Sequence, residues 1–284
     1  MQWRKRVSSA SLLYFLLEGF RGNLGIIKEL YNYRQMIIGF VKRDLKGRYK
    51  SSFLGFLWTF INPLLQLLVY TVVFSTIIRQ PNIKQFYLFL FVALIPWIFF
   101  STSIAGGAWC VVSQNTMVTK IYFPREVLPI SYVTSAFVNM LLTYLVVFPV
   151  VILSGRGLNP VALLYLPIIM IVEYFLALGI TMITSALTVY FRDLEYILSI
   201  ITMAWQFMTP IMYDVDILEG HTRLQKLFYI NPMTSIIIAY RDIMYYGRVP
   251  KLSTLTTAIG MGVVFTILGF LIFGKLKRRF AEEL

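Results

Sequence analysis

The sequence predicts an all-α integral membrane protein with six transmembrane helices, and three observations lead to this prediction. First, 58% of the 284 residues are hydrophobic and 14% are charged. A soluble domain has a charged share of about a quarter. Second, several charge-free runs approach or exceed the roughly 20 residues that a helix needs to cross a bilayer. Third, Lys and Arg residues gather beside these runs in an asymmetric way, which is the pattern of loops that stay on the cytoplasmic side.

The chain begins with the basic stretch WRKR and the apolar stretch SLLYFLL, in the manner of a signal peptide. However, Glu18, Gly19 and Arg21 follow without a clear small-residue cleavage site. We therefore expect this start to be retained.

The residues from Leu24 to Arg43 predict an amphipathic helix that lies in the cytoplasmic interface. Apolar side chains recur at helical spacing and polar side chains occupy the opposite side. The apolar positions are Ile26, Leu30, Tyr33, Ile37 and Val41, and the polar positions are Lys28, Asn32, Gln35 and Lys42.

The predicted spans follow from runs that contain no charge, or only one. They are Ser51–Ile78, Gln85–Thr119, Val127–Gly155, Gly157–Phe191, Tyr196–Tyr213 and Leu252–Gly274. The fifth is the shortest and contains Pro210, which kinks or ends a helix because it lacks a backbone donor. The stretch Leu227–Tyr240 is too short to cross and is broken by Pro232, so we expect re-entrant or interfacial helices between spans five and six.

Charge distribution orients these spans. With both termini cytoplasmic, the predicted cytoplasmic segments carry 18 of the 26 Lys and Arg residues. A seventh span would place the basic stretch KLKRR outside, against this bias. The predicted organisation is therefore a cytoplasmic segment at 1–50, a six-span membrane domain at 51–274 and a basic cytoplasmic tail at 275–284.

Several chemistries are not supported by the sequence. One cysteine, Cys110, and one histidine, His221, allow neither an internal disulfide nor a His/Cys metal site, so we expect no cofactor on this chain. The stretch GFLIFGK from Gly269 to Lys275 matches GxxxxGK, but it ends an apolar helix and Leu276 follows instead of Ser or Thr. No nucleophile, base and oxyanion set is visible, so we expect no enzyme. The basic residues lie beside apolar spans, which favours lipid headgroups over nucleic acid.

The cations beside the first span carry the first functional hypothesis. They can contact lipid phosphates at the inner leaflet, or serve only as an anchor that fixes topology. These residues are Arg43, Lys46, Arg48 and Lys50.

Glu173 lies near the middle of the predicted fourth span, where an ionisable group indicates a function. It can relay a proton or hydrogen-bond a sugar hydroxyl. Alternatively, it is a protonated or paired residue that holds helices together, which fits the lack of an oppositely charged residue at the middle of a span.

Aromatic and amide side chains in spans one and five are candidates for lining a polysaccharide path, because aromatic rings stack on the C–H faces of sugars. The alternative is an interfacial aromatic belt with ordinary packing. The candidates are Trp58, Asn62 and Gln66 in span one and Trp205, Gln206 and Thr209 in span five.

The cytoplasmic loop from Ser113 to Pro129 is predicted to contain a short helix. Ser113 or Asn115 can cap it, residues 116–122 can form it and Pro124 stops it. Such a helix can dock into the groove of a partner protein, or simply connect two spans.

Several ordered blocks resemble the permeases of bacterial ABC exporters for lipid-linked polysaccharides such as O-antigen, wall polysaccharide, capsule and teichoic acid. The blocks are Arg43-Asp44-Leu45, Arg48-Tyr49-Lys50, Leu54-Gly55, Trp58, Asn62-Pro63-Leu64, KIYFPREVLP from Lys120, FRDLEYI from Phe191, TPIMY from Thr209 and NPMT from Asn231. The similarity covers most of the chain from about residue 40 onward.

The resemblance implies a six-span homodimer in the bacterial cytoplasmic membrane that works with two separate ATPase subunits, which bind MgATP. It also implies a channel at the dimer interface, lined by spans one and five, for a polyprenyl-diphosphate-linked polysaccharide. The residues that it places in the ATPase cleft are Asn115, Thr116, Val118, Lys120, Ile121 and Tyr122.

Three other functions stay open from the sequence. The first is an ABC exporter of the same fold for a drug or a small lipid. The second is a proton-coupled flippase that uses Glu173. The third is a polyprenyl-phosphate glycosyltransferase, which the lack of clustered acidic residues in the loops disfavours.

Overall fold

The computed structural model describes residues 25, 28–49, 53–77, 83–214 and 228–284, and all regular structure in these ranges is helical. This confirms the predicted all-α class for the described residues. Lys50, His221 and the start of the chain up to residue 24 lie outside them. The elements are α2 (Arg34–Tyr49), η1 (Gly55–Leu57), α3 (Trp58–Thr71), η2 (Val72–Ile77), α4 (Phe86–Gly107), η3 (Val112–Gln114), α5 (Asn115–Lys120), α6 (Val127–Leu153), α7 (Pro160–Leu163), α8 (Leu166–Tyr190), α9 (Leu194–Met208), α11 (Pro232–Met244), α12 (Leu252–Leu276), η5 (Lys277–Arg279) and α13 (Phe280–Glu283).

Five helical segments are long and apolar enough to cross a bilayer. They cover Gly55–Phe74, Phe86–Gly107, Val127–Leu153, Pro160–Tyr190 and Leu252–Glu283. The predicted fifth span corresponds to α9, whose 15 residues fall short of the roughly 20 that a span needs. The helix ends at Met208 because Thr209 is extended, as the residue before a proline tends to be. By length alone, the structure therefore supports five of the six predicted spans.

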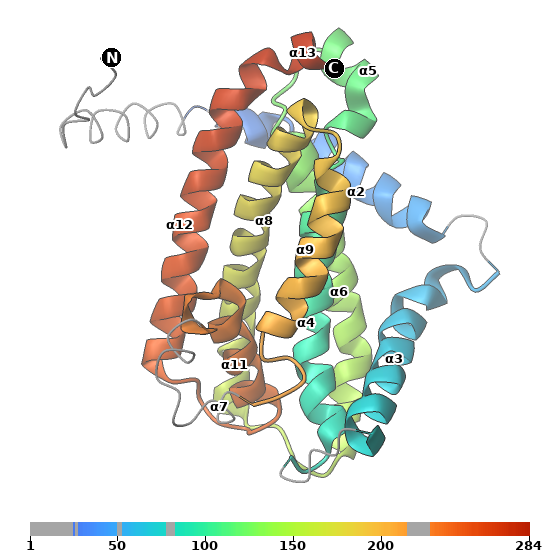
Figure 1. Cartoon of the computed structure of the whole chain (residues 1–284), viewed down its shortest axis with the longest axis vertical. Helices are drawn as coiled ribbons and strands as arrows, with labels where there is room; N and C mark the ends of the chain where they lie inside the picture. Colours follow the sequence, from blue (N-terminus) through green and yellow to red (C-terminus); the bar gives the residue numbers. More distant parts are fainter. Residues whose placement is uncertain (1–24, 26–27, 50–52, 78–82, 215–227) are drawn as a thin grey trace.

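Helix α4 forms the centre of the bundle, in contact with α3, α6, α8, α9 and α11 (Figure 1). Every residue from Leu88 to Trp97 is buried. A helix that is apolar on all sides is typical of a protein core or of a membrane span. The first span, Gly55–Phe74, is much less buried. Within its apolar stretch 17% of the residues are buried, compared with 78% for α4. Much of the surface of α3 is thus left for lipid or for another chain.

Helices α8 and α12 pack closely along their length, because glycines lie where their backbones meet. A Cβ atom added at Gly179 would lie 2.3 Å from the carbonyl oxygen of Phe265, and one added at Gly269 would lie 2.4 Å from the carbonyl oxygen of Gly179. The Thr266 hydroxyl also donates a hydrogen bond to the Phe175 carbonyl, at 2.9 Å. These contacts join α8 and α12 into one packed unit.

Helix α2 lies across the bundle, near the end that carries α5 and α13 (Figure 1), and it packs on α6. Its apolar positions Leu30, Tyr33 and Ile37 are partly buried against the core. The predicted polar positions are exposed, and they are Lys28, Asn32, Gln35 and Lys42. The described residues among these positions therefore differ in exposure as predicted, and the helix extends beyond Arg43 to Tyr49.

Helix α11 lies at the opposite end of the bundle (Figure 1) and is buried along most of its length. The Asn231 side chain caps it by accepting from the Met233 amide at 3.0 Å, and Pro232 occupies the first turn, where no backbone donor is needed. The buried Arg241 guanidinium donates to the Ile211 carbonyl at 2.7 Å and lies 3.4 Å from the centre of the Phe89 ring. These contacts fix α11 against α4 and against the segment that follows α9.

Candidate functional site

Helix α5 presents a compact exposed surface at one end of the molecule (Figure 1). Val118 is 3% exposed and fixes the helix to the core, with Met117 partly buried beside it. The other residues that the family resemblance places in an ATPase cleft are exposed, and they are Asn115, Thr116, Lys120, Ile121 and Tyr122. Ile121 and Tyr122 are adjacent large side chains that are 56% and 86% exposed. The arrangement suits contact with another protein.

The ends of α5 differ slightly from the prediction. The helix begins at Asn115, whose side-chain oxygen accepts from the Thr116 amide at 2.5 Å and from the Thr116 hydroxyl at 3.0 Å. It ends at Lys120 instead of Tyr122, because Ile121 is extended with φ −124° and ψ 135°. The chain then runs to Pro124, which cannot continue a helix. The extended end leaves the Tyr122 side chain projecting beyond the helix.

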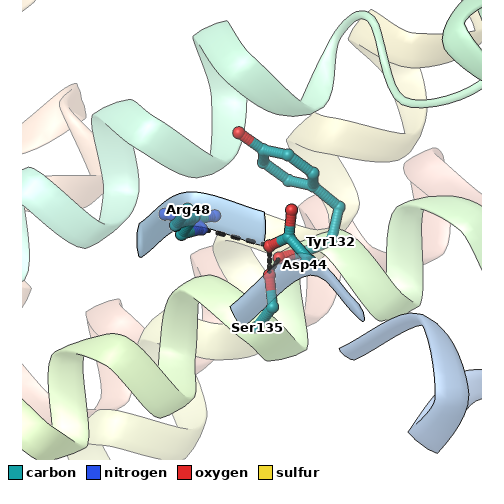
Figure 2. A network of polar contacts seen from close by, with 4 residues as sticks. All are labelled: Asp44, Arg48, Tyr132 and Ser135. Atoms are coloured by element: carbon teal, nitrogen blue, oxygen red, sulfur yellow. Dashed lines mark hydrogen bonds and ion pairs between the residues drawn. The ribbon is translucent and has the colours of Figure 1, made fainter. Parts of the chain in front are cut away.

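A polar network fixes α2 to α6 (Figure 2). The Arg48 guanidinium donates to the Asp44 carboxylate at 3.1 Å, and the Ser135 hydroxyl donates to the same carboxylate oxygen. The Arg48 guanidinium carbon also lies 5.7 Å from the centre of the Tyr132 ring. Arg48 is therefore engaged within the protein, whereas Arg43 and Lys46 are exposed.

A cavity of about 1000 Å³ lies between α2, η1 and α6. Its walls are mainly apolar, with Leu45, Phe56 and Leu142 among them, and its cationic side chains all come from α2. These cations are Lys42, Arg43 and Lys46. An apolar space beside cations is the chemical counterpart of a lipid that carries a phosphate.

The candidates on α3 lie on its outer side. Trp58 is 39% exposed, Asn62 is exposed, and the Gln66 amide approaches the Asn62 side-chain oxygen at 3.5 Å. On α9, the Gln206 amide donates to the Tyr70 hydroxyl of α3 at 3.2 Å. The Gln206 side chain thus links α9 to α3.

Trp205 and Thr209 serve a different contact. The Trp205 indole N–H donates to the Asn231 side-chain oxygen at 2.9 Å, and the Asn231 amide donates to the Thr209 hydroxyl at 2.9 Å. The Trp205 ring also packs edge-on against Phe100, with 5.2 Å between the ring centres. Both residues therefore connect the end of α9 to the start of α11, and Thr209 is fully buried.

Glu173 is fully buried in α8. The Tyr240 hydroxyl of α11 donates to its carboxyl group at 2.6 Å, and the Tyr144 ring of α6 stacks on Tyr240 with 6.3 Å between ring centres. This geometry agrees with the alternative in which Glu173 is a paired residue that holds helices together. Three helices meet at this cluster.

Sequence reasoning did not identify Asp44 as the partner of Arg48, or Ser135 as a further partner of Asp44. Asp44 lies four residues before Arg48, a spacing at which helical ion pairs form, so this pair was detectable from the sequence. Ser135 is 91 residues from Asp44, and nothing in a single sequence signals a contact over that separation.

Comparison with known proteins agrees with the geometry. Residues 36–245 match the model of the family described as ABC-2 type transporter. An O-antigen export system permease protein RfbA of Myxococcus xanthus is 36% identical over 259 residues, which cover 91% of this chain and 99% of that protein. A protein of the same name from Klebsiella pneumoniae is 33% identical over 265 residues, which cover 92% of this chain and 97% of that protein. These relatives are transport subunits and not enzymes. The chain therefore belongs to the ABC-2 type transporter family as a membrane-embedded permease of an ABC transporter.

Proposed function

We propose that the protein is the membrane subunit of an ATP-driven exporter that moves a polyprenyl-diphosphate-linked polysaccharide across the bacterial cytoplasmic membrane. In this proposal two copies of the chain assemble with two cytoplasmic ATPase subunits, which bind MgATP. Each chain spans the membrane six times, with α9 as the short fifth span, α11 as part of a re-entrant pair and both termini in the cytoplasm. The relatives are named as O-antigen export permeases, which supports the choice of substrate.

The exposed surface of α5 is the observation that carries the proposal. A membrane protein without its own ATP site must receive the work of hydrolysis through a contact with the ATPase. Helix α5 offers such a contact, because Val118 fixes it to the core while Lys120 and Tyr122 project from it. An exposed aromatic side chain such as that of Tyr122 is well suited to the centre of a protein interface.

The outer sides of α3 and α9 suit the interface of the proposed dimer. Apolar side chains cover much of both helices, and Asn62 lies among those of α3. A channel between two copies needs polar or aromatic groups that contact sugars, and Trp58, Asn62 and Gln66 provide them on α3. On α9, Trp205 and Gln206 are both partly exposed, and Gln206 is joined to α3 through Tyr70.

Gentle extraction of the protein from its native membrane tests the proposal. We expect a soluble ATPase subunit to co-purify in a one-to-one ratio with this chain, and the complex to contain two copies of each. Mass spectrometry of the intact complex measures both ratios. A chain that is recovered as a dimer without any ATPase would contradict the proposal.

The cavity beside α2 provides a site where the lipid phosphates can bind before export. Arg43 and Lys46 are exposed on its wall, whereas Arg48 is already paired with Asp44. We expect Arg43→Gln together with Lys46→Gln to lower export by about thirtyfold, because two phosphate contacts of roughly 1 kcal/mol each are lost. Quantification of surface polysaccharide measures the effect.

The matched control for this prediction is Lys28→Gln with Arg34→Gln, on the exposed side of the same helical region and outside the cavity wall. We expect this pair to leave export near the wild-type level. Both pairs should leave the amount of assembled complex unchanged. If the two double variants export equal amounts of polysaccharide, the phosphate-binding role is contradicted and α2 serves only as an anchor that fixes topology.

A further inference from the structure

The end of α12 contacts the segment that joins α5 to α6, although the two are about 150 residues apart in the chain. The Arg125 guanidinium donates to the backbone carbonyl of Lys277, and the Lys277 ammonium forms an ion pair with the Glu126 carboxylate. Glu126 is 1% exposed, so its charge is compensated inside the protein. The turn after α5 is therefore attached to the C-terminal end of α12 by two adjacent residues.

The residues after α12 complete this attachment. Phe280 is fully buried, with 5.5 Å between the centres of its ring and the Phe273 ring, and α13 packs against α5 (Figure 1). The Arg125 guanidinium carbon lies 5.9 Å from the centre of the Phe280 ring. The Tyr190 hydroxyl of α8 donates to the Leu276 carbonyl at 2.9 Å. The predicted basic tail thus contains an apolar anchor, and it folds back beside α5.

Helix electrostatics favour the same arrangement. Glu126 precedes the first residue of α6, where the positive end of the helix dipole stabilises a carboxylate. Lys277 follows the last residue of α12, where the negative end stabilises an ammonium group. The Lys277 carbonyl at this end accepts both from the Arg125 guanidinium and from the Phe280 amide. The ion pair therefore joins the start of α6 to the end of α12, and each charge lies at the helix end whose dipole stabilises it.

We propose that Glu126 and Lys277 are positioning residues that transmit the movement of α5 to α12. This proposal rests on the proposed docking of the ATPase at α5. Helix α6 receives this movement directly, because it begins at Val127. Helix α12 receives it through the Glu126–Lys277 pair and passes it to α8 through the contact of Gly179 with Gly269. One docking helix thereby moves three spans, on two sides of the central α4.

A double-mutant cycle on the intact complex in membrane vesicles tests this proposal. We expect Glu126→Gln and Lys277→Gln each to lower the amount of polysaccharide exported per ATP hydrolysed by about fivefold or more, with ATPase binding retained. The double variant should export at least as much polysaccharide per ATP as either single variant, because no unpaired charge remains.

Lys277→Arg should keep the wild-type ratio of export to ATP hydrolysis, since the guanidinium can also pair with Glu126. The control is Arg279→Gln, an exposed cation two residues away. Normal coupling in both single variants, or additive losses in the double variant, would overturn the proposal.

Hydrogen exchange in the permease alone separates this proposal from the ATPase assignment. We expect Lys277→Gln to accelerate exchange of the amides at 115–122 by about tenfold, because α5 loses part of its support. Arg279→Gln should not change this exchange. Unchanged exchange in Lys277→Gln would overturn the positioning role, whatever binds α5. Faster exchange in a protein that recruits no ATPase would support the positioning role and contradict only the proposed function.

Discussion

Replacing Gly179 with alanine is expected to destabilise the protein by about 3 kcal/mol, the upper part of the range for overpacking. The added Cβ atom would lie 2.3 Å from the Phe265 carbonyl oxygen and 2.6 Å from the Thr266 amide nitrogen. Both atoms belong to the backbone of α12, so no side-chain rotation can relieve the clash. The helices must separate, and the Phe175–Thr266 hydrogen bond would lengthen with them. The midpoint of thermal unfolding in detergent measures the loss.

Gly260→Ala and Gly274→Ala are the matched controls on α12, because a Cβ atom at either position meets nothing within 4 Å. Alanine is a better helix former than glycine, so these variants should be unchanged or more stable by about 0.5 to 1 kcal/mol. A Gly179→Ala protein as stable as these controls would show that α8 and α12 do not approach each other as closely as described.

The second large effect is expected at α5. Lys120→Ala combined with Tyr122→Ala should reduce the recovered ATPase subunit by about tenfold or more, since a central tyrosine often contributes about 2 kcal/mol to an interface and the neighbouring Lys120 charge is lost as well. Both side chains are exposed in the permease, so their removal leaves its core intact. Quantitative co-purification from membranes with equal permease content measures the loss.

Tyr196→Ala provides a matched control for this prediction. Tyr196 is 72% exposed at the start of α9, compared with 86% for Tyr122, and it lies outside α5. We expect the ATPase to remain bound to this variant. Equal retention by the Tyr196 variant and the Lys120/Tyr122 variant would place the ATPase contact elsewhere on the chain.

The transmembrane pattern was largely predictable from the sequence, because apolar length and basic flanks are local properties. Five predicted spans appear as helices of sufficient length, and the apolar positions Leu30, Tyr33 and Ile37 before Arg43 are partly buried. The position of α5 followed from Pro124 and the short polar stretch before it. The weakness of the fifth span was also visible, since Pro210 limits α9 at its end.

The contacts between distant segments were not predictable, because they depend on how helices are placed in space. The approach of Gly179 to Gly269, and the pairing of Glu126 with Lys277, join residues that no local pattern connects. The stretch GFLIFGK shows the difficulty. Its Gly269 matched a phosphate-binding pattern by spacing, but in the structure it lies within α12 and allows the close packing of α8.

The prediction for Trp205 and Thr209 shows a similar limit. Their residue types suit a sugar path as well as a helix junction, and a single sequence cannot distinguish the two. In the structure both residues contact Asn231, which begins α11. Gln206, between them in sequence, faces Tyr70 on α3 instead. The direction of each side chain, which sequence alone does not give, separates neighbouring residues into different roles.

The central claim is ATP-driven export of a lipid-linked polysaccharide, and the fate of the polymer after removal of this chain tests it most directly. We predict that long-chain polysaccharide disappears from the cell surface while its polyprenyl-diphosphate-linked form accumulates on the cytoplasmic side. Restoring the chain should restore the surface polymer only when its ATPase can hydrolyse ATP. Normal surface polysaccharide in cells without the protein would contradict the proposed substrate, and export that continues with an inactive ATPase would contradict the energy source.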